Sequence, residues 1–215
     1  MSSRDYHESL WEGIPPGLQP SYASLRAAFL LGHLAAERQR RGRPVRVLDI
    51  GCGEGYFADV LAGADADVVG CDIAEEPLRR ARAAHPSLDL RLVEAEGPLP
   101  FEDADFDLVW AGETIEHVLD TSTWLSELRR VLRSGGLILL STPDHGLLSR
   151  LRLALSERAF AGHFDPRSDH LRFYMPRTLV GLLADFGFAE VSVARRGGVP
   201  GARRVLLASA RRKRF

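Results

Sequence analysis

Short apolar runs alternate along this chain with stretches whose apolar residues recur at helical spacing. Val45 to Ile50 is apolar and β-branched with turn residues on both sides, which predicts a buried strand. From Tyr56 to Gly63 the apolar positions follow the period of a helix. Four more strands are predicted at 67–72, 88–94, 105–111 and 137–141. This alternation predicts an α/β fold with a mainly parallel sheet and helices on both faces.

The segments before the first strand have different patterns. Residues 1–20 carry several prolines and no periodicity, so we expect an irregular N-terminal arm, whose Tyr6 and Trp11 could fold over a substrate pocket. Residues 21–41 have helical periodicity, and the predicted apolar face contains Leu25, Ala28, Phe29, Gly32 and Ala35. Residues 21–215 are expected to form a single domain, because a chain of 215 residues suits one core.

The second half of the chain predicts further helices. The apolar stripe of Trp124, Leu125, Leu128, Val131 and Leu132 predicts a helix that ends at a cap formed by residues 134–136. A helix can also form over 146–157, with a loop over 161–169, and we expect residues 144–175 to be an insertion on the substrate side.

A last helix and a hairpin are predicted at the end of the chain. The helix opens at Pro176 and closes at Gly187. Residues 190–196 and 203–210 alternate like the two strands of a C-terminal hairpin joined through 197–201. The hairpin would add an antiparallel strand and bring the predicted sheet to seven strands.

Three alternating glycines, Gly51, Gly53 and Gly55, follow the first strand directly. Without side chains, such a turn lets backbone approach a ligand closely, and the helix that follows favours polar or anionic ligand groups at its start. The second strand ends in Asp72. A carboxylate there lies beside the glycine turn of a βαβ unit and can accept both hydroxyl protons of a ribose. The chain is therefore predicted to bind an adenosine-containing cofactor.

The glycine spacing and a preceding acid narrow the choice of cofactor. A dinucleotide fingerprint reads G-x-G-x-x-G, whereas the third glycine here comes one position early and Tyr56 stands where that pattern has a small residue. Asp49 places a negative charge beside the turn, which would repel a pyrophosphate and suit a cation. S-adenosylmethionine carries an ammonium and a sulfonium, so these features favour it over NAD.

Val47 to Gly55, Val-Leu-Asp-Ile-Gly-Cys-Gly-Glu-Gly, and the later Gly-Cys-Asp-Ile at 70–73 resemble the class I S-adenosylmethionine-dependent methyltransferases. The resemblance covers residues 45–143 and implies a Rossmann-like fold. In such enzymes an acidic stretch with Leu-Pro-Phe lines the adenine, and Glu94 and Ala95 match it best, while Glu96 fits a solvated loop nearly as well. The resemblance assigns cofactor binding to Asp49, Gly51, Cys52, Gly53, Tyr56, Asp72, Ile73, Glu94, Ala95, Glu96, Gly112 and Glu113.

Glu113, Glu116 and His117 follow the fourth strand at a spacing that would direct their side chains the same way on a helical turn. The pattern resembles the metal-binding motif of ubiquinone-biosynthesis O-methyltransferases and small-RNA 2′-O-methyltransferases, and His170, in an Asp-His segment, is then the fourth candidate ligand. These four residues would suit Mg²⁺ or Mn²⁺. The resemblance also implies catalytic roles for Glu113, His117 and His170. Without metal, the Glu-His pair would serve ribose contacts or helix packing.

Composition and charge restrict the partners. A net charge of -1 argues against chain-wide attraction to nucleic acid, and we expect the arginines near the C-terminus to be solvated strand ends. The only two cysteines, Cys52 and Cys71, are expected to be interior and reduced. No apolar run is long enough to span a membrane and no signal pattern is present, so we expect no membrane partner and a cytoplasmic location.

The features above predict an S-adenosylmethionine-dependent methyltransferase that acts on a small molecule, at oxygen. A metal-dependent RNA ribose 2′-O-methyltransferase and a non-catalytic S-adenosylmethionine-binding protein are the alternatives, and an NAD-dependent oxidoreductase is a more distant one. Aromatic residues in 1–20 and 144–175 are the expected walls of the acceptor site. The sequence predicts neither the acceptor nor an oligomeric state.

Overall fold

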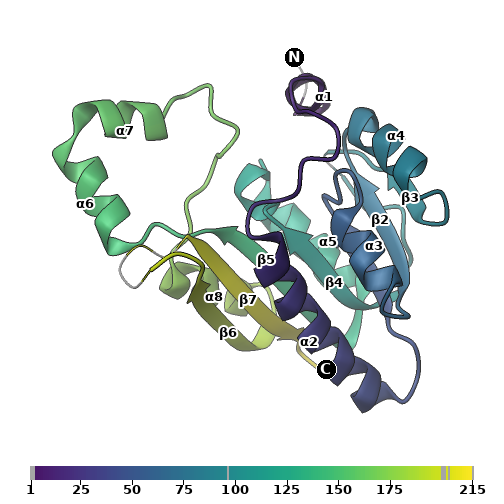
Figure 1. The fold of residues 1–215 in the computed structure, drawn as a ribbon. Helices are drawn as coiled ribbons and strands as arrows, with labels where there is room; N and C mark the ends of the chain where they lie inside the picture. Colours follow the sequence, from purple (N-terminus) through teal and green to yellow (C-terminus); the bar gives the residue numbers. More distant parts are fainter. Residues whose placement is uncertain (1–2, 96, 200–201, 203, 215) are drawn as a thin grey trace.

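The computed structural model describes residues 3–95, 97–199, 202 and 204–214. Within them a seven-stranded sheet has the order β3-β2-β1-β4-β5-β7-β6 (Figure 1). Its strands are β1 Arg46–Ile50, β2 Asp67–Asp72, β3 Asp89–Leu92, β4 Phe106–Gly112, β5 Leu132–Pro143, β6 Phe188–Arg196 and β7 Val205–Arg212. The first five are parallel, and β7 lies antiparallel between β5 and β6. The predicted Rossmann-like sheet with an antiparallel C-terminal strand is confirmed.

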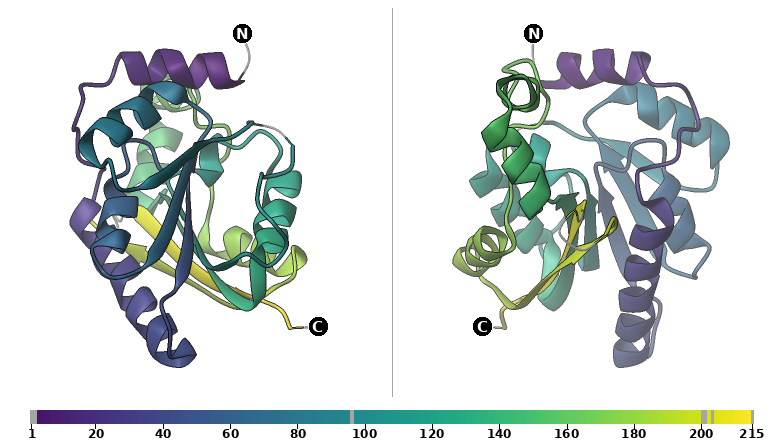
Figure 2. Two further views of the ribbon diagram at one scale, coloured as in Figure 1. Left: turned by 90° about the vertical axis from the view of Figure 1, so that its right-hand side faces the viewer. Right: turned by 60° about the vertical axis from the view of Figure 1, so that its left-hand side comes forward.

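Helices cover both faces of this sheet (Figure 2). They are α1 Ser3–Glu12, α2 Ala23–Arg41, α3 Tyr56–Ala62, α4 Glu75–Ala84, α5 Thr121–Val131, α6 Leu147–Leu155, α7 Glu157–His163 and α8 Pro176–Asp185, with a 3-10 turn, η1, at Ile115–His117. Alternate residues of β5 face opposite sides of the sheet. Leu139 packs with buried residues of α2 and α3, whereas Ile138 packs with buried residues of α5 and α8. Two cores therefore hold the sheet between the helical layers.

The N-terminal arm is helical over Ser3–Glu12, so the expectation of an irregular arm is wrong. Contacts with the rest of the chain explain the difference. Arg4 donates to the backbone carbonyls of Ile73 and Val93, beyond the ends of β2 and β3. Glu8 accepts from two backbone N–H groups at the start of α4. These tertiary partners stabilise a short helix that has no buried residue of its own.

The predicted face of α2 is also wrong. The helix buries Ala23, Arg26, Leu30, Leu34 and Glu37, whereas Ala28, Gly32 and Ala35 are exposed. Two charged residues lie on the buried stripe because each has an oppositely charged partner in the fold. A count of apolar residues alone therefore selects the wrong side of this helix.

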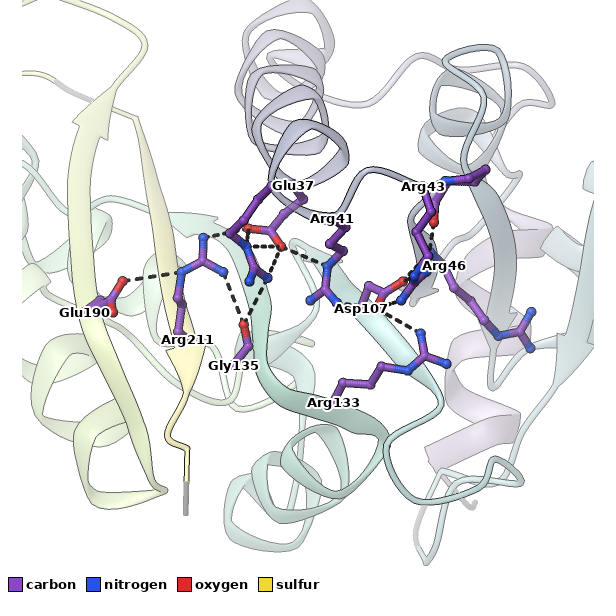
Figure 3. A network of polar contacts seen from close by, with 11 residues as sticks. Glu37, Arg41, Arg43, Arg46, Asp107, Arg133, Gly135, Glu190 and Arg211 are labelled. Carbon is purple, nitrogen blue, oxygen red and sulfur yellow. Dashed lines mark hydrogen bonds and ion pairs between the residues drawn. The ribbon is translucent and has the colours of Figure 1, made fainter.

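The C-terminal end of α2 is held by an ionic network at the amino ends of the strands (Figure 3). Glu37, 1% exposed in its side chain, pairs with Arg40, Arg41 and Arg211. Asp107 accepts from three arginines, and although its burial acts to raise its pKa, Arg43 and its other partners lower the pKa to about 2. Arg211 is thus part of the structure and not the solvated strand end that we expected.

Helix α5 ends at Val131 and β5 begins at the next residue, so the predicted cap at residues 134–136 is wrong. Asp120 begins the helix by accepting from the backbone N–H groups of Ser122 and Thr123. In the β4–β5 pairing, Phe106 lies opposite Leu132 and Leu108 opposite Leu137. Gly135 and Gly136 therefore lie in an irregular segment of β5. The pairing of β5 with β4 on both sides of them overrides the local preference for a helix cap.

The insertion after β5 contains two helices where one was predicted. Ser156 separates them, and its hydroxyl accepts from the backbone N–H of Ala159 at the start of α7. Helix α7 continues to His163, so the expected loop begins later. In the C-terminal hairpin, residues 200, 201 and 203 of the predicted segments lie outside the described residues. No described helix combines the length and the apolar content that a membrane span requires.

Candidate active site

A cavity of about 450 Å³ lies at the carboxyl ends of β1 to β4, where open α/β sheets bind their ligands. Helix α1 forms one wall with His7 and Trp11, and α5 forms another with Trp124. Of the residues predicted from sequence, those on the cavity wall are Gly51, Asp72, Ile73, Glu94, Ala95, Glu113 and His117. The structure therefore gathers residues from four strand ends around one space.

The glycine turn has the backbone shape that its sequence requires. Gly51, Gly53 and Gly55 have φ of 71°, 52° and 82°, which residues with a side chain rarely adopt. A β-carbon at Gly51 would lie 2.6 Å from the hydroxyl of Thr114, and one at Gly53 would lie 3.0 Å from the ring of Trp11. The turn is therefore closed in by η1 on one side and by α1 on the other.

Two carboxylates lie beside this turn. Asp72 accepts from the backbone N–H groups of Gly53 and Ala74, at 2.9 and 3.0 Å, and burial raises its pKa. Asp49 is 1% exposed beneath the turn, and its Oδ2 has no hydrogen-bond partner among the described residues. Burial and the charge of Asp72 raise the pKa of Asp49 to about 8. A nearby cation would reverse that shift, because it stabilises the charged form.

The opposite end of the cavity is bounded by the segment after β3. Ile73, Glu94 and Ala95 line it, and Arg4 of α1 pairs with Glu94 at 3.1 Å. Glu96, the third predicted residue of the acidic stretch, lies outside the described residues. The contact between Arg4 and Glu94 places α1 directly over the region that the resemblance assigns to adenine.

Five of the predicted cofactor residues are not on the cavity wall. Cys52 packs with Leu78, Ala81 and Leu90, and burial raises the pKa of its thiol, so it is a packing residue. The other four are Asp49 and Gly53, described above, Tyr56, which packs edge-on against Phe57, and Gly112, which lies against the ring of Trp110.

The expectation that Glu113, Glu116 and His117 share one helical turn is wrong. Only Ile115–His117 form a turn, whereas Glu113 has a left-handed backbone with φ of 53°. Its carboxylate pairs instead with Arg26 of α2, at 2.8 Å. Ligand atoms of Glu116, His117 and His170 lie within 4.8 Å of one another. The structure thus brings together three of the four predicted metal ligands and separates Glu113 from them.

Burial dominates the electrostatics of this group. Glu116 is 1% exposed, and neither of its carboxylate oxygens has a hydrogen-bond partner among the described residues. Burial and the charge of Glu113 raise its pKa to about 8. Burial lowers the pKa of His117, whose Nδ1 lies 3.0 Å from the carbonyl of Asp169. Two imidazoles and a carboxylate suit Mn²⁺ better than Mg²⁺, which prefers oxygen ligands.

Arg26 is the residue of the site that sequence analysis missed. Its side chain is 3% exposed and pairs with Glu113, while burial lowers its pKa. The available signal was its spacing, because Arg26, Leu30 and Leu34 recur at helical spacing on one face of α2. A charge within such a stripe indicates a buried partner elsewhere in the fold.

Comparison with known proteins identifies the family. A methyltransferase-domain family matches residues 48–140. A malonyl-[acyl-carrier protein] O-methyltransferase of Erwinia billingiae is 34% identical over 172 residues, which are 78% of this chain and 68% of the relative. This chain belongs to the class I S-adenosylmethionine-dependent methyltransferases. A ubiquinone biosynthesis O-methyltransferase of Thiobacillus denitrificans is 32% identical, over 66% of this chain and 63% of that protein.

Solved structures of other methyltransferases share the fold. The DszA carbon methyltransferase has a TM-score of 0.68 at 17% identity, covering 92% of this chain and 56% of its own. The chain spans only 38% to 50% of the length of three mycobacterial relatives that also match it. Arg26 lies outside the matched domain, so the charge partner of Glu113 comes from a segment that the family pattern does not include.

Proposed function

We propose that this protein transfers the methyl group of S-adenosylmethionine to an oxygen atom of a small-molecule acceptor in the cytoplasm. The observation that carries the proposal is the shared cavity, which has Asp72 beside the glycine turn and Glu113 with His117 on its other wall. The names of the two relatives above support oxygen as the acceptor atom, since both are O-methyltransferases. A net charge of -1 disfavours a nucleic acid as the acceptor.

In this proposal the cofactor follows the strand ends. Asp72 accepts from the ribose hydroxyls, while Ile73, Glu94 and Ala95 enclose the adenine. The cationic end lies near Gly51, above the buried carboxylate of Asp49. Cys52, Gly53, Tyr56 and Gly112 keep the turn in shape. A cavity of about 450 Å³ is within the range of cofactor pockets.

Methyl transfer is a single displacement, so the protein must align the acceptor oxygen with the methyl carbon and remove a proton from the acceptor. His117 is the candidate base, because burial lowers its pKa and leaves the imidazole neutral. Asp169, whose carbonyl lies 3.0 Å from Nδ1, orients the ring and leaves Nε2 as the basic atom. Glu113, held by Arg26, is expected to contact the acceptor or the ribose.

Radiolabelled S-adenosylmethionine with a panel of phenols, quinols and carboxylic acids tests the function. We expect a labelled product for at least one class, either a base-stable methyl ether from a phenol or quinol or a methyl ester from a carboxylic acid. His117→Ala should lose most of the turnover and retain its affinity for the cofactor. Cofactor binding without any product across the panel would favour a non-catalytic binding protein instead.

As an alternative to His117 acting as the base, Glu116, His117 and His170 are the candidate ligands of a divalent metal, which when bound would make an acceptor hydroxyl more acidic. If the enzyme uses this metal, EDTA should abolish activity and Mn²⁺ should restore it more fully than Mg²⁺. Isothermal titration with Mn²⁺ should give a site that Glu116→Gln and His170→Ala lose. The variant Glu75→Gln, altered at an exposed acid on α4, is the control. Full turnover in chelator would exclude the metal.

Cofactor affinity is expected to rise with pH until it levels off above about pH 8. The pKa of Asp49 is about 8 in the free protein, and a bound sulfonium or ammonium would lower it, so binding releases a proton. Release of one proton gives at most about a tenfold change in affinity per pH unit. Calorimetry in two buffers that differ in ionisation heat measures the proton directly, and Asp49→Asn should remove it. An equal slope in that variant would assign the proton to another group.

The same proton affects the stability of the free protein. The pKa of Asp49 is higher in the folded than in the unfolded chain, so the folded state keeps a proton that the unfolded state loses above about pH 4. The contribution of Asp49 to stability is therefore present at low pH and lost as pH rises toward 8. The pKa of Glu116 is also raised to about 8, so its contribution to stability is likewise lost as pH rises.

A further inference from the structure

Helix α6 presents its apolar side to solvent. Four leucines, Leu147, Leu148, Leu151 and Leu155, are 56%, 55%, 46% and 84% exposed, and the helix has no buried residue. Their spacing places them on one face of the helix. A contiguous apolar stripe exposed on a folded domain usually marks an interaction surface, since water contact with it is unfavourable.

Arginines border this stripe on both sides. At 100° per residue, Arg150 lies on one side of the leucines and Arg152 on the other, and Arg158 follows at the start of α7. Neither Arg152 nor Arg158 is in an ion pair within the described residues, and Glu157 is the only acid in the two helices. The helix therefore combines an outward apolar stripe with a surplus of positive charge at its edges.

A second cavity lies between the two helices. Arg152, Ser156, Arg158 and His163 are among its lining residues, so two arginines, a serine and a histidine border one space. Guanidinium groups bind phosphate oxygens through paired hydrogen bonds. Ser156 on the cavity wall directly follows Leu155 of the stripe in sequence, so the phosphate of a lipid could bind in this cavity if its acyl chains contacted α6.

The two helices stand apart from the sheet, at the same end of the molecule as α1 (Figures 1 and 2). Phe160 in α7 and Phe164 directly after it are also exposed, at 54% and 42%. The chain then returns directly to the active site, where the backbone N–H of Leu171 donates to the carbonyl of Glu116. The exposed surface is thus continuous in sequence with the wall of the catalytic cavity.

We propose that α6 and α7 seat this protein on the surface of a bilayer that contains anionic phospholipids. Helix α6 lies in the plane of the interface, with its leucines among the acyl chains and its arginines at the phosphates. A lipid surface fits better than a protein partner because the cations lie on both borders of the stripe, at the level where headgroups meet acyl chains. The attraction of these arginines to an anionic leaflet adds to the free energy of binding that comes from burying the leucines.

This mode of binding differs from spanning a membrane, which needs a longer apolar helix than the described residues contain. It departs from the expectation of no membrane partner, which rested on the lack of a spanning segment. Surface binding goes beyond the proposed function and does not depend on it. One consequence does rest on the proposed function: an acceptor dissolved in the bilayer could reach the cavity without crossing bulk water.

Flotation of the full chain with vesicles tests the proposal. The protein should float with vesicles of phosphatidylcholine and phosphatidylglycerol in equal parts, and far less with phosphatidylcholine alone. The double variant Leu151→Glu/Leu155→Glu should lose at least about tenfold of the binding, since it places charge in the apolar stripe. Arg152→Ala/Arg158→Ala should lose the preference for anionic lipid while keeping weak binding to both vesicle types.

The control is Leu18→Glu, which alters a leucine that is 66% exposed outside this surface and should bind as the unaltered protein does. Melting temperatures of all variants should agree, because the exchanged side chains are exposed. Binding by Leu151→Glu/Leu155→Glu at the level of the unaltered protein would overturn the proposal. So would the absence of flotation at low salt, or a dimer in solution that this double variant dissociates, which would assign the stripe to a second copy of the chain.

Discussion

Replacing Arg26 by methionine is expected to destabilise the folded protein by roughly 3 kcal/mol, near the lower end of the range for breaking a buried ion pair. The guanidinium lies 2.8 Å from Glu113, and the two side chains are 3% and 27% exposed. Without Arg26 the Glu113 carboxylate would remain largely desolvated and close to Glu116, which is itself buried. The exposure of Glu113 to the cavity keeps the effect from being larger.

A loss of this size should lower the melting temperature by roughly 6–12 °C in a domain of this length. The double variant Arg26→Met/Glu113→Gln should recover most of it, because no unpaired charge remains. Arg38→Met on the same helix is the matched control, since Arg38 is 50% exposed and pairs with an Asp65 that is 90% exposed. That exchange should cost no more than about 1 kcal/mol. Equal melting of the two single variants would mean that the Arg26–Glu113 pair does not stabilise the fold.

Asp72→Ala is expected to weaken S-adenosylmethionine binding by about 1–3 kcal/mol, which is on the order of a 5- to 150-fold loss of affinity. Asp72 lies on the cavity wall at the end of β2 and is 8% exposed, so a ribose bound there would lose a desolvated hydrogen-bond acceptor. Isothermal titration calorimetry gives the affinity. An affinity equal to that of the unaltered protein would remove Asp72 from the ribose site.

Asp72 also accepts from the N–H groups of Gly53 and Ala74, so a change in the turn must be separated from a change in ligand contact. Asp72→Asn keeps the shape of the side chain and one acceptor oxygen. It should leave the melting temperature nearly unchanged and still weaken S-adenosylmethionine binding. Asp185→Ala, at an exposed acid at the end of α8, controls for a general loss of negative charge. It should leave affinity unchanged within error.

The central sheet could be predicted closely because its signals are local. Buried parallel strands are short apolar runs between turn residues, and the second strand, predicted at 67–72, lies at Asp67–Asp72. The glycine turn was equally predictable, since its left-handed backbone excludes side chains whatever surrounds it. For the same reason Gly51, Asp72 and Ile73 could be placed beside one cavity from their positions at strand ends.

Predictions that assumed a regular local structure failed where distant contacts decided the conformation. The segment around Gly135 looked like a helix cap, yet it lies within β5 because the pairing with β4 continues on both sides of it. Glu113 was placed on a helical turn with Glu116, but its backbone is left-handed and its side chain is drawn to Arg26. Neither β4, which pairs with the strand around Gly135, nor Arg26, which pairs with Glu113, is a close neighbour in sequence.

The amino-acid sequence by itself determined the alternation of strands and helices from β1 to β5, the glycine turn and the acids at the first two strand ends, because each depends on residues within a few positions. Only the tertiary structure decided that α1 is a helix over the cavity, that α2 buries a cation, and that α6 exposes its leucines. These features depend on side chains that meet across the fold, such as Glu8 with the start of α4 and Arg26 with Glu113. Such contacts have no signature in local spacing.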